Sequence, residues 1–135
     1  TNADEWRPDA PVSKLLLDAP CSALGTLRRH PEGAWIKREA EIDRFPTAQA
    51  RLLAAAAHMV VSGGTVIYCV CTPLKSEGLE IVEGALSDGL YTRHAIEPDE
   101  IPGFEHCLTE AGDLLTIPSE GAGHDAFFIT RLTRL

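Results

Sequence analysis

The chain has 135 residues, 44% of them hydrophobic and 24% charged, a composition typical of a single folded domain and not of a disordered segment. Its 12 basic and 20 acidic residues give a formal charge of −8, so the chain as a whole lacks the basic surface with which proteins usually bind nucleic acid. No apolar run reaches the roughly 18 residues of a membrane helix and no leader opens the chain, so we expect a soluble, cytoplasmic protein without a membrane partner.

The N-terminal part predicts a loop, a strand and a second, basic loop. The first dozen residues are polar and rich in proline, which is typical of a loop. Lys14–Leu17 is a short apolar run that suits a buried parallel strand, and Pro20 would end it. Residues 22–35 contain two glycines, a proline and local positive charge, so they predict a loop or a broken helix.

The middle of the chain predicts helix, strand and helix in succession. Apolar residues recur with helical period from Pro46 to about Val61, and Gly63–Gly64 would stop that helix. Thr65–Val70 is rich in β-branched and aromatic residues and predicts a buried strand. Ser76 would cap a second helix that runs to about Leu86, with Gly89 after its end.

The C-terminal part changes character and predicts strands and loops. Tyr91–Ile96, Leu114–Ile117 and Ala126–Leu132 are strand candidates, and residues 97–112 are loop-like. The last two strands are separated by a turn at residues 121–123 and are close enough in sequence to pair antiparallel at an edge. Strand, helix, strand, helix and strand in this order predict an α/β sheet with parallel strands and helical crossovers.

The four cysteines indicate reduced thiols. Cys69 and Cys71 lie two apart in the same predicted strand, so their side chains point to the same face. Cys71 follows the strand and precedes a helix, the better position for reactivity, whereas Cys69 is expected to be a core residue. Cys107 lies in a predicted loop without a partner motif, and no cysteine or histidine spacing predicts a metal site.

Two short motifs follow the two predicted parallel strands. Asp18-Ala-Pro-Cys21 comes after the first and Cys71-Thr-Pro73 after the second. Ligands of open α/β sheets bind beyond the carboxyl ends of the strands, so Asp18, Cys21 and Cys71 are expected to share one pocket. The alternative is that the cysteines are ordinary small core residues and that Asp18 and Pro20 merely end a strand.

These motifs carry a family resemblance that spans nearly the whole chain. They resemble, in the same order, motifs of the Sun family of RNA cytosine methyltransferases, in particular the bacterial branch that modifies small-subunit ribosomal RNA. The matching stretches are Asp18–Ser22 within Leu15–Pro31, Gln49-x-x-Leu52-Leu53, Gly63-Gly64-x-x-x-Tyr68-x-x-Cys71-Thr72, and Asp125–Leu132.

The resemblance implies a covalent reaction with S-adenosylmethionine as cofactor. In the family the cysteine of the later motif attacks cytosine carbon 6, which makes carbon 5 nucleophilic; that role carries over to Cys71. The earlier cysteine, here Cys21, helps to release the methylated base. Asp18 matches the carboxylate that lies against base and cofactor, and Pro20 is placed beside the cofactor. The neighbouring Arg28 and Arg29 are expected to contact RNA phosphate.

The sequence departs from the family pattern at four points. The acidic pair that often follows the second motif is here only Glu77, followed by Gly78. Cys69 replaces a serine, and Ala23 stands where glycine is common. The glycine-rich turn that binds the cofactor is missing, so the resemblance implies that residues 1–135 are the C-terminal part of a catalytic domain, namely the C-terminal half of a Rossmann-like class I methyltransferase sheet. The sheet would then have an open apolar edge, and the isolated fragment is expected to be inactive, to bind cofactor weakly and to self-associate.

Three other interpretations stay open. Cys21 could be the nucleophile, as in DNA cytosine methyltransferases. The chain could be a non-catalytic interaction module, or the cysteines could form a redox or metal site. Arg28 and Arg29 could equally be solvated, and Trp6 and Trp35 could stack on a base, although isolated tryptophans more often pack inside a protein.

Overall fold

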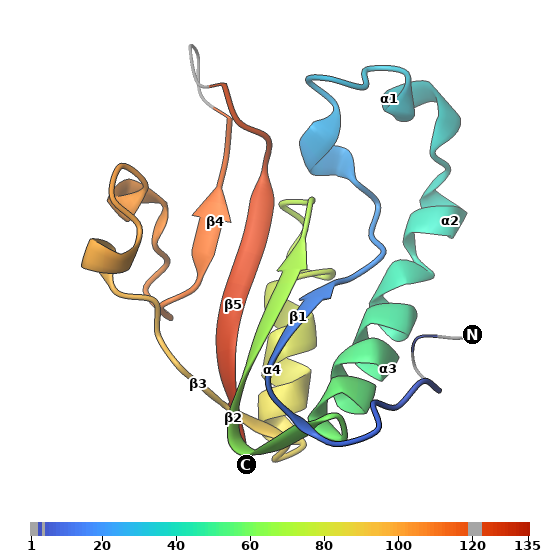
Figure 1. Cartoon of the computed structure of the whole chain (residues 1–135). Coiled ribbons are helices and arrows are strands. Elements are labelled where there is room, and N and C mark those ends of the chain that lie inside the picture. Colours follow the sequence, from blue (N-terminus) through green and yellow to red (C-terminus); the bar gives the residue numbers. More distant parts are fainter. Residues whose placement is uncertain (1–2, 4, 119–122) are drawn as a thin grey trace.

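A mixed β-sheet with two helices against one face forms the centre of the structure (Figure 1). The computed structural model describes residue 3, residues 5–118 and residues 123–135. The longer elements are β1 (Val12–Asp18), α3 (Phe45–Ala57), β2 (Val60–Val70), α4 (Leu79–Ser87) and β5 (Phe127–Arg134). The short elements are η1 (Leu24–Thr26), α1 (Gly33–Ile36), α2 (Glu39–Ile42), β3 (Tyr91–Arg93), η2 (Pro98–Glu100), η3 (Glu105–Cys107) and β4 (Leu114–Thr116).

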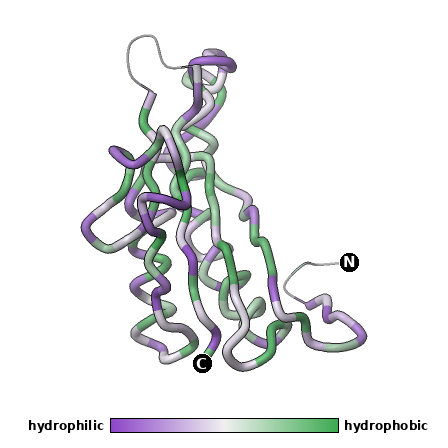
Figure 2. Tube along the Cα trace, turned by 60° about the vertical axis from the view of Figure 1, so that its left-hand side comes forward, coloured by the Kyte–Doolittle hydropathy of each residue, from purple (hydrophilic) through white to green (hydrophobic). Residues whose placement is uncertain are grey.

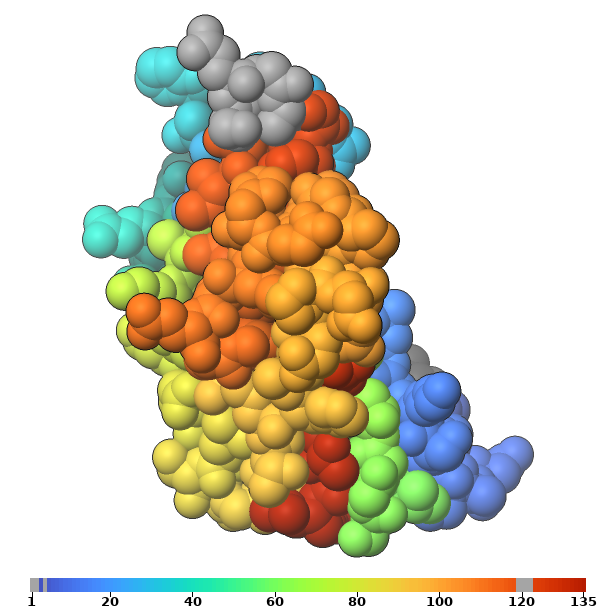
Figure 3. All heavy atoms as spheres, turned by 90° about the vertical axis from the view of Figure 1, so that its left-hand side faces the viewer, coloured from blue at the N-terminus to red at the C-terminus, as the bar shows by residue number. Residues whose placement is uncertain are grey.

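The sheet has the strand order β1-β2-β5-β3, and β4 also pairs with β5. β1 and β2 are parallel neighbours joined through α3, whereas β5 pairs antiparallel with β2, β3 and β4. Since β2 occupies one side of β5, β3 and β4 share its other side and form the antiparallel edge. Figure 3 shows the segment between β3 and β4 making up the middle of this face of the molecule. The expected α/β fold with an antiparallel edge is confirmed.

The core lies between the sheet and the helices α3 and α4. On β2 the side chains of Val66, Tyr68 and Val70 are fully buried, and they belong to one cluster with Leu53 of α3 and Val82 of α4. Each such aliphatic side chain contributes roughly 1.5–3 kcal/mol on burial. In Figure 2 the hydrophobic stretches run through the strands, and the described segment next to the N-terminus is largely hydrophilic. The alternating residues of β2 are only half-buried on the opposite face.

The predicted helix over Pro46–Val61 was too long at its C-terminal end. α3 ends at Ala57, and Val60 already pairs with Val12 of β1. The residue pairing then jumps to Lys14 with Thr65, so Gly63–Gly64 lie in a bulge of β2 and do not stop the helix. Gly63 has φ +78°, a conformation that glycine adopts without cost. Apolar residues at 59 and 60 fit a helix and a strand equally well, which is why periodicity misplaced the boundary.

Two further boundaries differ from the sequence prediction. Ser76 does not cap α4, because the N-cap residue is Gly78. The residues before it form a separate turn, in which the backbone N–H groups of residues 77 and 78 donate to the carbonyl of Leu74. β3 ends at Arg93, after which the chain turns away through the short helices η2 and η3. The predicted turn at residues 121–123 falls mostly outside the described part of the chain.

β1 is the outer strand of the described sheet, and its free edge is apolar. Leu16 of β1 is 69% exposed. Beside it lies a cavity of about 420 Å³, lined mainly by Trp6, Leu15, Leu17, Leu52 and Met59. The open apolar edge expected from the sequence is therefore present. Among the described residues no helix is long and apolar enough to cross a membrane.

Gly25 joins the loop after β1 to the ends of β2 and β5. Its N–H donates to the carbonyl of Cys71 (3.0 Å), and its own carbonyl accepts from the N–H of Ala126 (3.0 Å). A Cβ atom at this position would overlap the carbonyl oxygen of Ala126 and lie 2.8 Å from that of Cys71. Because both neighbours are backbone atoms, they cannot move aside without breaking this connection.

We therefore expect Gly25→Ala to lower the free energy of unfolding by about 2 kcal/mol or more. Gly84→Ala is the matched control, since Gly84 lies within α4 with nothing within 4 Å of the new Cβ. That change should raise stability by about 0.5–1 kcal/mol. Urea unfolding followed by circular dichroism measures both, and equal midpoints for Gly25→Ala and the wild type would contradict the packing argument.

Candidate active site

The carboxyl ends of β1 and β2 bring two cysteines into contact. The ladder continues beyond Asp18, where the N–H of Ala19 donates to the carbonyl of Cys69 (3.1 Å), so the following loop starts beside the end of β2. There the Sγ atoms of Cys21 and Cys71 lie 3.3 Å apart. Both thiols are half-buried and unoxidised. Two residues fifty positions apart in the sequence thus meet at one point.

Asp18 lies at the same end of the sheet and faces a third cysteine. The register pairs Asp18 with Cys69, and the Cys69 thiol points to Oδ1 of Asp18 at 3.7 Å. The expectation that Cys69 is a core residue was wrong, because its neighbours Tyr68 and Val70 point to the buried face of the sheet and Cys69 to the other. The carboxylate and three thiols therefore share one edge of the sheet.

The environment keeps two of these thiols protonated at neutral pH. Burial, followed by the hydrogen bond with Cys71, raises the pKa of Cys21 to about 12. Burial, together with the neighbouring charge of Asp18, raises the pKa of Cys69 to about 11. Both effects disfavour a thiolate at these two positions. Neither thiol is therefore a ready nucleophile in this state.

A buried carboxylate holds the loop that carries Cys21. Oε2 of Glu77, which is completely buried, accepts hydrogen bonds from the backbone N–H of Ser22 (2.8 Å) and from Nε2 of Gln49 (3.0 Å). The same Gln49 nitrogen also donates to the carbonyl of Pro20 (2.9 Å), and the Ser22 hydroxyl donates to that of Thr72 (3.1 Å). Polar groups of α3, of the turn before α4 and of both cysteine loops are thus joined in one buried network.

The sequence alone predicts no structural role for Gln49 or Glu77: Gln49 only matches a family motif, and Glu77 is a single acid where the family often has a pair. Two features of the sequence could have indicated such a role. Gln49 is a polar residue on the apolar face of a predicted helix, and Glu77 is an acid that follows closely on an apolar strand. A buried charge is costly unless it is hydrogen-bonded, so Glu77 indicates a constraint on the loop and not a solvent contact. The hydroxyl of Tyr68 adds to this by donating to the backbone carbonyl of Glu77 (2.6 Å).

The backbone is strained at the start of η1. Ala23 has φ +55°, in the left-handed region that glycine adopts freely and that costs other residues roughly 1–2 kcal/mol. The sequence resemblance led us to expect glycine at this position, and the backbone conformation of Ala23 fits that expectation. The turn lets Cys21 face Cys71 while Gly25 reaches the carbonyl of Cys71.

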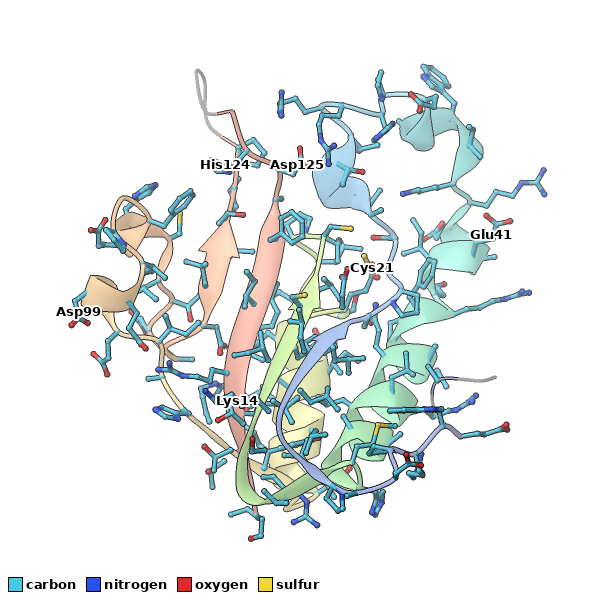
Figure 4. All side chains as sticks on the ribbon, in the orientation of Figure 1. Lys14, Cys21, Glu41, Asp99, His124 and Asp125 are labelled. Atoms are coloured by element: carbon cyan, nitrogen blue, oxygen red, sulfur yellow. The ribbon has the colours of Figure 1, made fainter. Side chains whose placement is uncertain are left out.

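Arg28 and Arg29 lie on the rim of the site and pair with an acid at the start of β5. Nε of Arg29 donates to Oδ2 of Asp125 (2.7 Å), and Arg28 approaches the same carboxylate at 3.6 Å. The hydrogen bond with Asp125 raises the pKa of Arg29, so this guanidinium stays protonated. Figure 4 shows Cys21 between Lys14, which lies further back along β1, and Asp125, which lies near the top of the view at the start of β5.

The structure thus brings Asp18, Cys21 and Cys71 to one edge of the sheet, with Pro20 exposed beside them. Arg28 and Arg29 lie next to this group and are engaged by Asp125. Among the described residues no group of three or more histidine, cysteine or acidic side chains is arranged to hold a metal ion.

Comparison with known proteins assigns the family. The family model for the 16S rRNA methyltransferase RsmB/F matches residues 1–133. The chain belongs to this family. The Sun-family membership expected from the motifs is thereby confirmed.

Individual relatives agree with this assignment. The ribosomal RNA small subunit methyltransferase B of Serratia proteamaculans is 37% identical over 138 residues, which cover 97% of this chain and 28% of the relative. A putative methyltransferase of Mycobacterium tuberculosis, Rv1407, is 35% identical over 130 residues, covering 94% of the chain and 27% of the relative. The chain therefore spans little more than a quarter of the length of these RsmB/F relatives.

Solved structures share the fold. The crystal structure of PH0851 superposes with a TM-score of 0.77 at 30% identity, over 90% of this chain and 26% of that one. NSun6 from Pyrococcus horikoshii, determined with SFG, gives a TM-score of 0.72 at 24% identity, over 94% and 31%. The expected Rossmann-like methyltransferase sheet is confirmed by these similarities.

The contact between two thiols makes a direct chemical prediction. Diamide, which takes two hydrogens from a pair of thiols, should convert Cys21 and Cys71 into a disulfide, detectable by peptide mass spectrometry. The rate should rise from pH 7 to pH 9, because a thiolate starts the reaction and burial holds the pKa of Cys21 at about 12.

Two variants serve as controls for this reaction. Cys69→Ser should leave the disulfide unchanged, and Cys21→Ser should abolish it. A main product that joins Cys69 to either of the other two cysteines would show that the site is arranged differently.

Proposed function

We propose that this chain supplies the cysteine side of the active site of an RNA methyltransferase that transfers a methyl group to carbon 5 of cytosine, in small-subunit ribosomal RNA. The observation that carries the proposal is the 3.3 Å contact between Cys21 and Cys71, at the same end of the parallel strands where Asp18 faces Cys69. Paired cysteines at the carboxyl ends of adjacent parallel strands suit a covalent reaction on a ring that is otherwise unreactive.

Cys71 is the proposed nucleophile. Its thiolate adds to carbon 6 of cytosine, which forms a C–S bond and moves the electron pair of the C5–C6 double bond onto carbon 5. Arg29 stabilises the thiolate electrostatically, and Asp125 keeps Arg29 in place. After methylation, a base removes the proton from carbon 5, the C–S bond breaks and the Cys71 thiolate is released.

Asp18 and Cys21 act in different steps of this reaction: Asp18 during the attack on the ring, and Cys21 during release of the product. The Asp18 carboxylate hydrogen-bonds the exocyclic amine or a protonated ring nitrogen of the cytosine, and so stabilises the ring as charge moves through it. Cys21 is protonated at neutral pH because its pKa is high, and its thiol contacts that of Cys71. Its role is to assist the release of the methylated base. The base must leave its stack to reach this edge of the sheet.

S-adenosylmethionine is the proposed cofactor and supplies the methyl group that carbon 5 accepts. Asp18 and Pro20 are exposed at the carboxyl end of β1, where a carboxylate oxygen can accept hydrogen bonds from a ligand, so these residues fit one edge of a cofactor site. SFG, present in the NSun6 structure, is an analogue of this cofactor. The glycine-rich turn for the rest of the cofactor is not in this sequence.

Residues 1–135 are proposed to form the C-terminal part of the catalytic domain. The relatives are more than three times as long, and β1 presents a free apolar edge to which a further parallel strand can add. The cofactor-binding half of the sheet, from the same polypeptide, is the proposed occupant of that edge. Without it, the exposed Leu16 and the adjoining cavity favour self-association.

The isolated chain should therefore bind S-adenosylmethionine only weakly. Isothermal titration of residues 1–135 should give a dissociation constant well above the micromolar range, and the full-length protein, as the control, should bind far more tightly. Micromolar affinity of the isolated chain would contradict the proposed division of the domain.

The full-length enzyme should form a covalent complex with RNA that carries 5-fluorocytosine, because fluorine at carbon 5 cannot leave as a proton does. Cys71→Ala should abolish the complex on a denaturing gel. Cys21→Ala should retain or accumulate it, since release is what this variant loses. The reverse pattern would transfer the nucleophilic role to Cys21.

A further inference from the structure

The short helix α1 exposes a large aromatic side chain next to the candidate active site. Trp35 is 91% exposed and the adjacent Ile36 is 68% exposed. Tryptophan buries more apolar surface than other residues when it packs, so a tryptophan that is almost entirely in water indicates a contact surface. Among the described residues, no neighbour buries Trp35.

The segment that carries Trp35 is attached to the site at both ends. We call residues 28–38 the α1 arm. At its start Arg29 is paired with Asp125, and near its end Nζ of Lys37 donates to the backbone carbonyl of Ser22, the residue after Cys21. Figure 1 shows α1 beyond the carboxyl ends of β1 and β2. The arm therefore projects Trp35 from the rim of the site.

The α1 arm is basic in an acidic chain. It contains four of the 12 basic residues, Arg28, Arg29, Lys37 and Arg38, and one of the 20 acidic ones, so its formal charge is +3 while the remaining residues carry −11. Arg28 and Arg38 are exposed. Asp125 offsets part of this charge through its ion pair with Arg29, and the exposed Arg28 and Arg38 make the arm a better contact for a phosphate backbone than the acidic remainder of the chain.

We propose that the α1 arm is a docking surface for single-stranded RNA, with Trp35 stacking on an unpaired base and Arg28 and Arg38 contacting the flanking phosphates. Exposed aromatics interleaved with cations are the combination that binds single strands, because every base offers a π-face to stack on. Charge complementarity favours RNA over a protein partner here. This inference rests on the proposed function and extends it by naming where the substrate strand is held.

Stacking makes Trp35 a direct reporter of binding. The chain contains two tryptophans, so Trp6→Phe leaves Trp35 as the single indole. Titration of that variant with a 12-nucleotide single-stranded RNA that contains cytosine should quench its emission. A duplex of the same sequence should quench it less, since its bases are already stacked. Raising the salt concentration should weaken the binding.

Affinity measurements on variants give the decisive comparison. In fluorescence anisotropy with a labelled RNA of the same sequence, Trp35→Ala should weaken binding about tenfold, and Trp35→Phe should restore a large part of the loss. Trp6→Ala is the matched control, because Trp6 is also partly exposed but lies beside β1, and it should leave the affinity unchanged. Circular dichroism verifies that each variant is folded.

The possible failures separate this inference from the proposed function. Equal affinity of Trp35→Ala and wild type, or no RNA binding by the wild type, would overturn the docking surface. An emission change of Trp35 with protein concentration alone would assign it to a second copy of the chain and would likewise overturn the proposal. A full-length enzyme that binds RNA through Trp35 but forms no adduct with 5-fluorocytosine RNA would instead refute the covalent mechanism and leave the docking surface standing.

Discussion

The parallel pairing of β1 with β2 positions Asp18 and the cysteines of the candidate site. Two parallel strands that are hydrogen-bonded to each other present their carboxyl ends at the same edge of the sheet, and here the register places Asp18 opposite Cys69. The residues immediately after each strand are then adjacent, so Cys21 meets Cys71. α3, as the crossover between these strands, sets their order and packs its apolar face against them. The site is thus a consequence of strand topology.

The short distance between the two sulfurs also depends on buried hydrogen bonds that hold the loop carrying Cys21. Glu77 and Gln49 provide it, because a buried carboxylate must be satisfied by hydrogen bonds, and its available donors are the backbone of Ser22 and the Gln49 amide. The polar groups thereby fix the path of a loop that contains little regular structure. Arg29 and Asp125 brace the same loop from the side of β5. Such preorganisation is what the proposed reaction on a base would require of this loop.

The surfaces of this chain differ in what they offer a partner. The free edge of β1 is apolar and geometrically suited to another strand, which agrees with the greater length of the RsmB/F relatives. The α1 arm is basic and aromatic, which suits a nucleic acid strand. The β1 edge precedes Cys21 in the chain and the α1 arm follows it, so the two proposed contact surfaces are carried by different segments.

Local patterns in the sequence determined the elements and the chemistry-bearing residues. Apolar runs ending in Asp18 and before Cys71 marked the two strands, and motif order identified the family. The periodicity of apolar residues mispredicted the helix end at residues 59–64, because an apolar residue there fits either a helix or a strand. The pairing with β1 makes it a strand. The sequence likewise could not show that Cys69 faces Asp18, that Glu77 is buried beside the loop of Cys21, or that the side chain of Trp35 is exposed to solvent. Those facts depend on which segments become neighbours, and long-range pairing between strands, not local propensity, decided them.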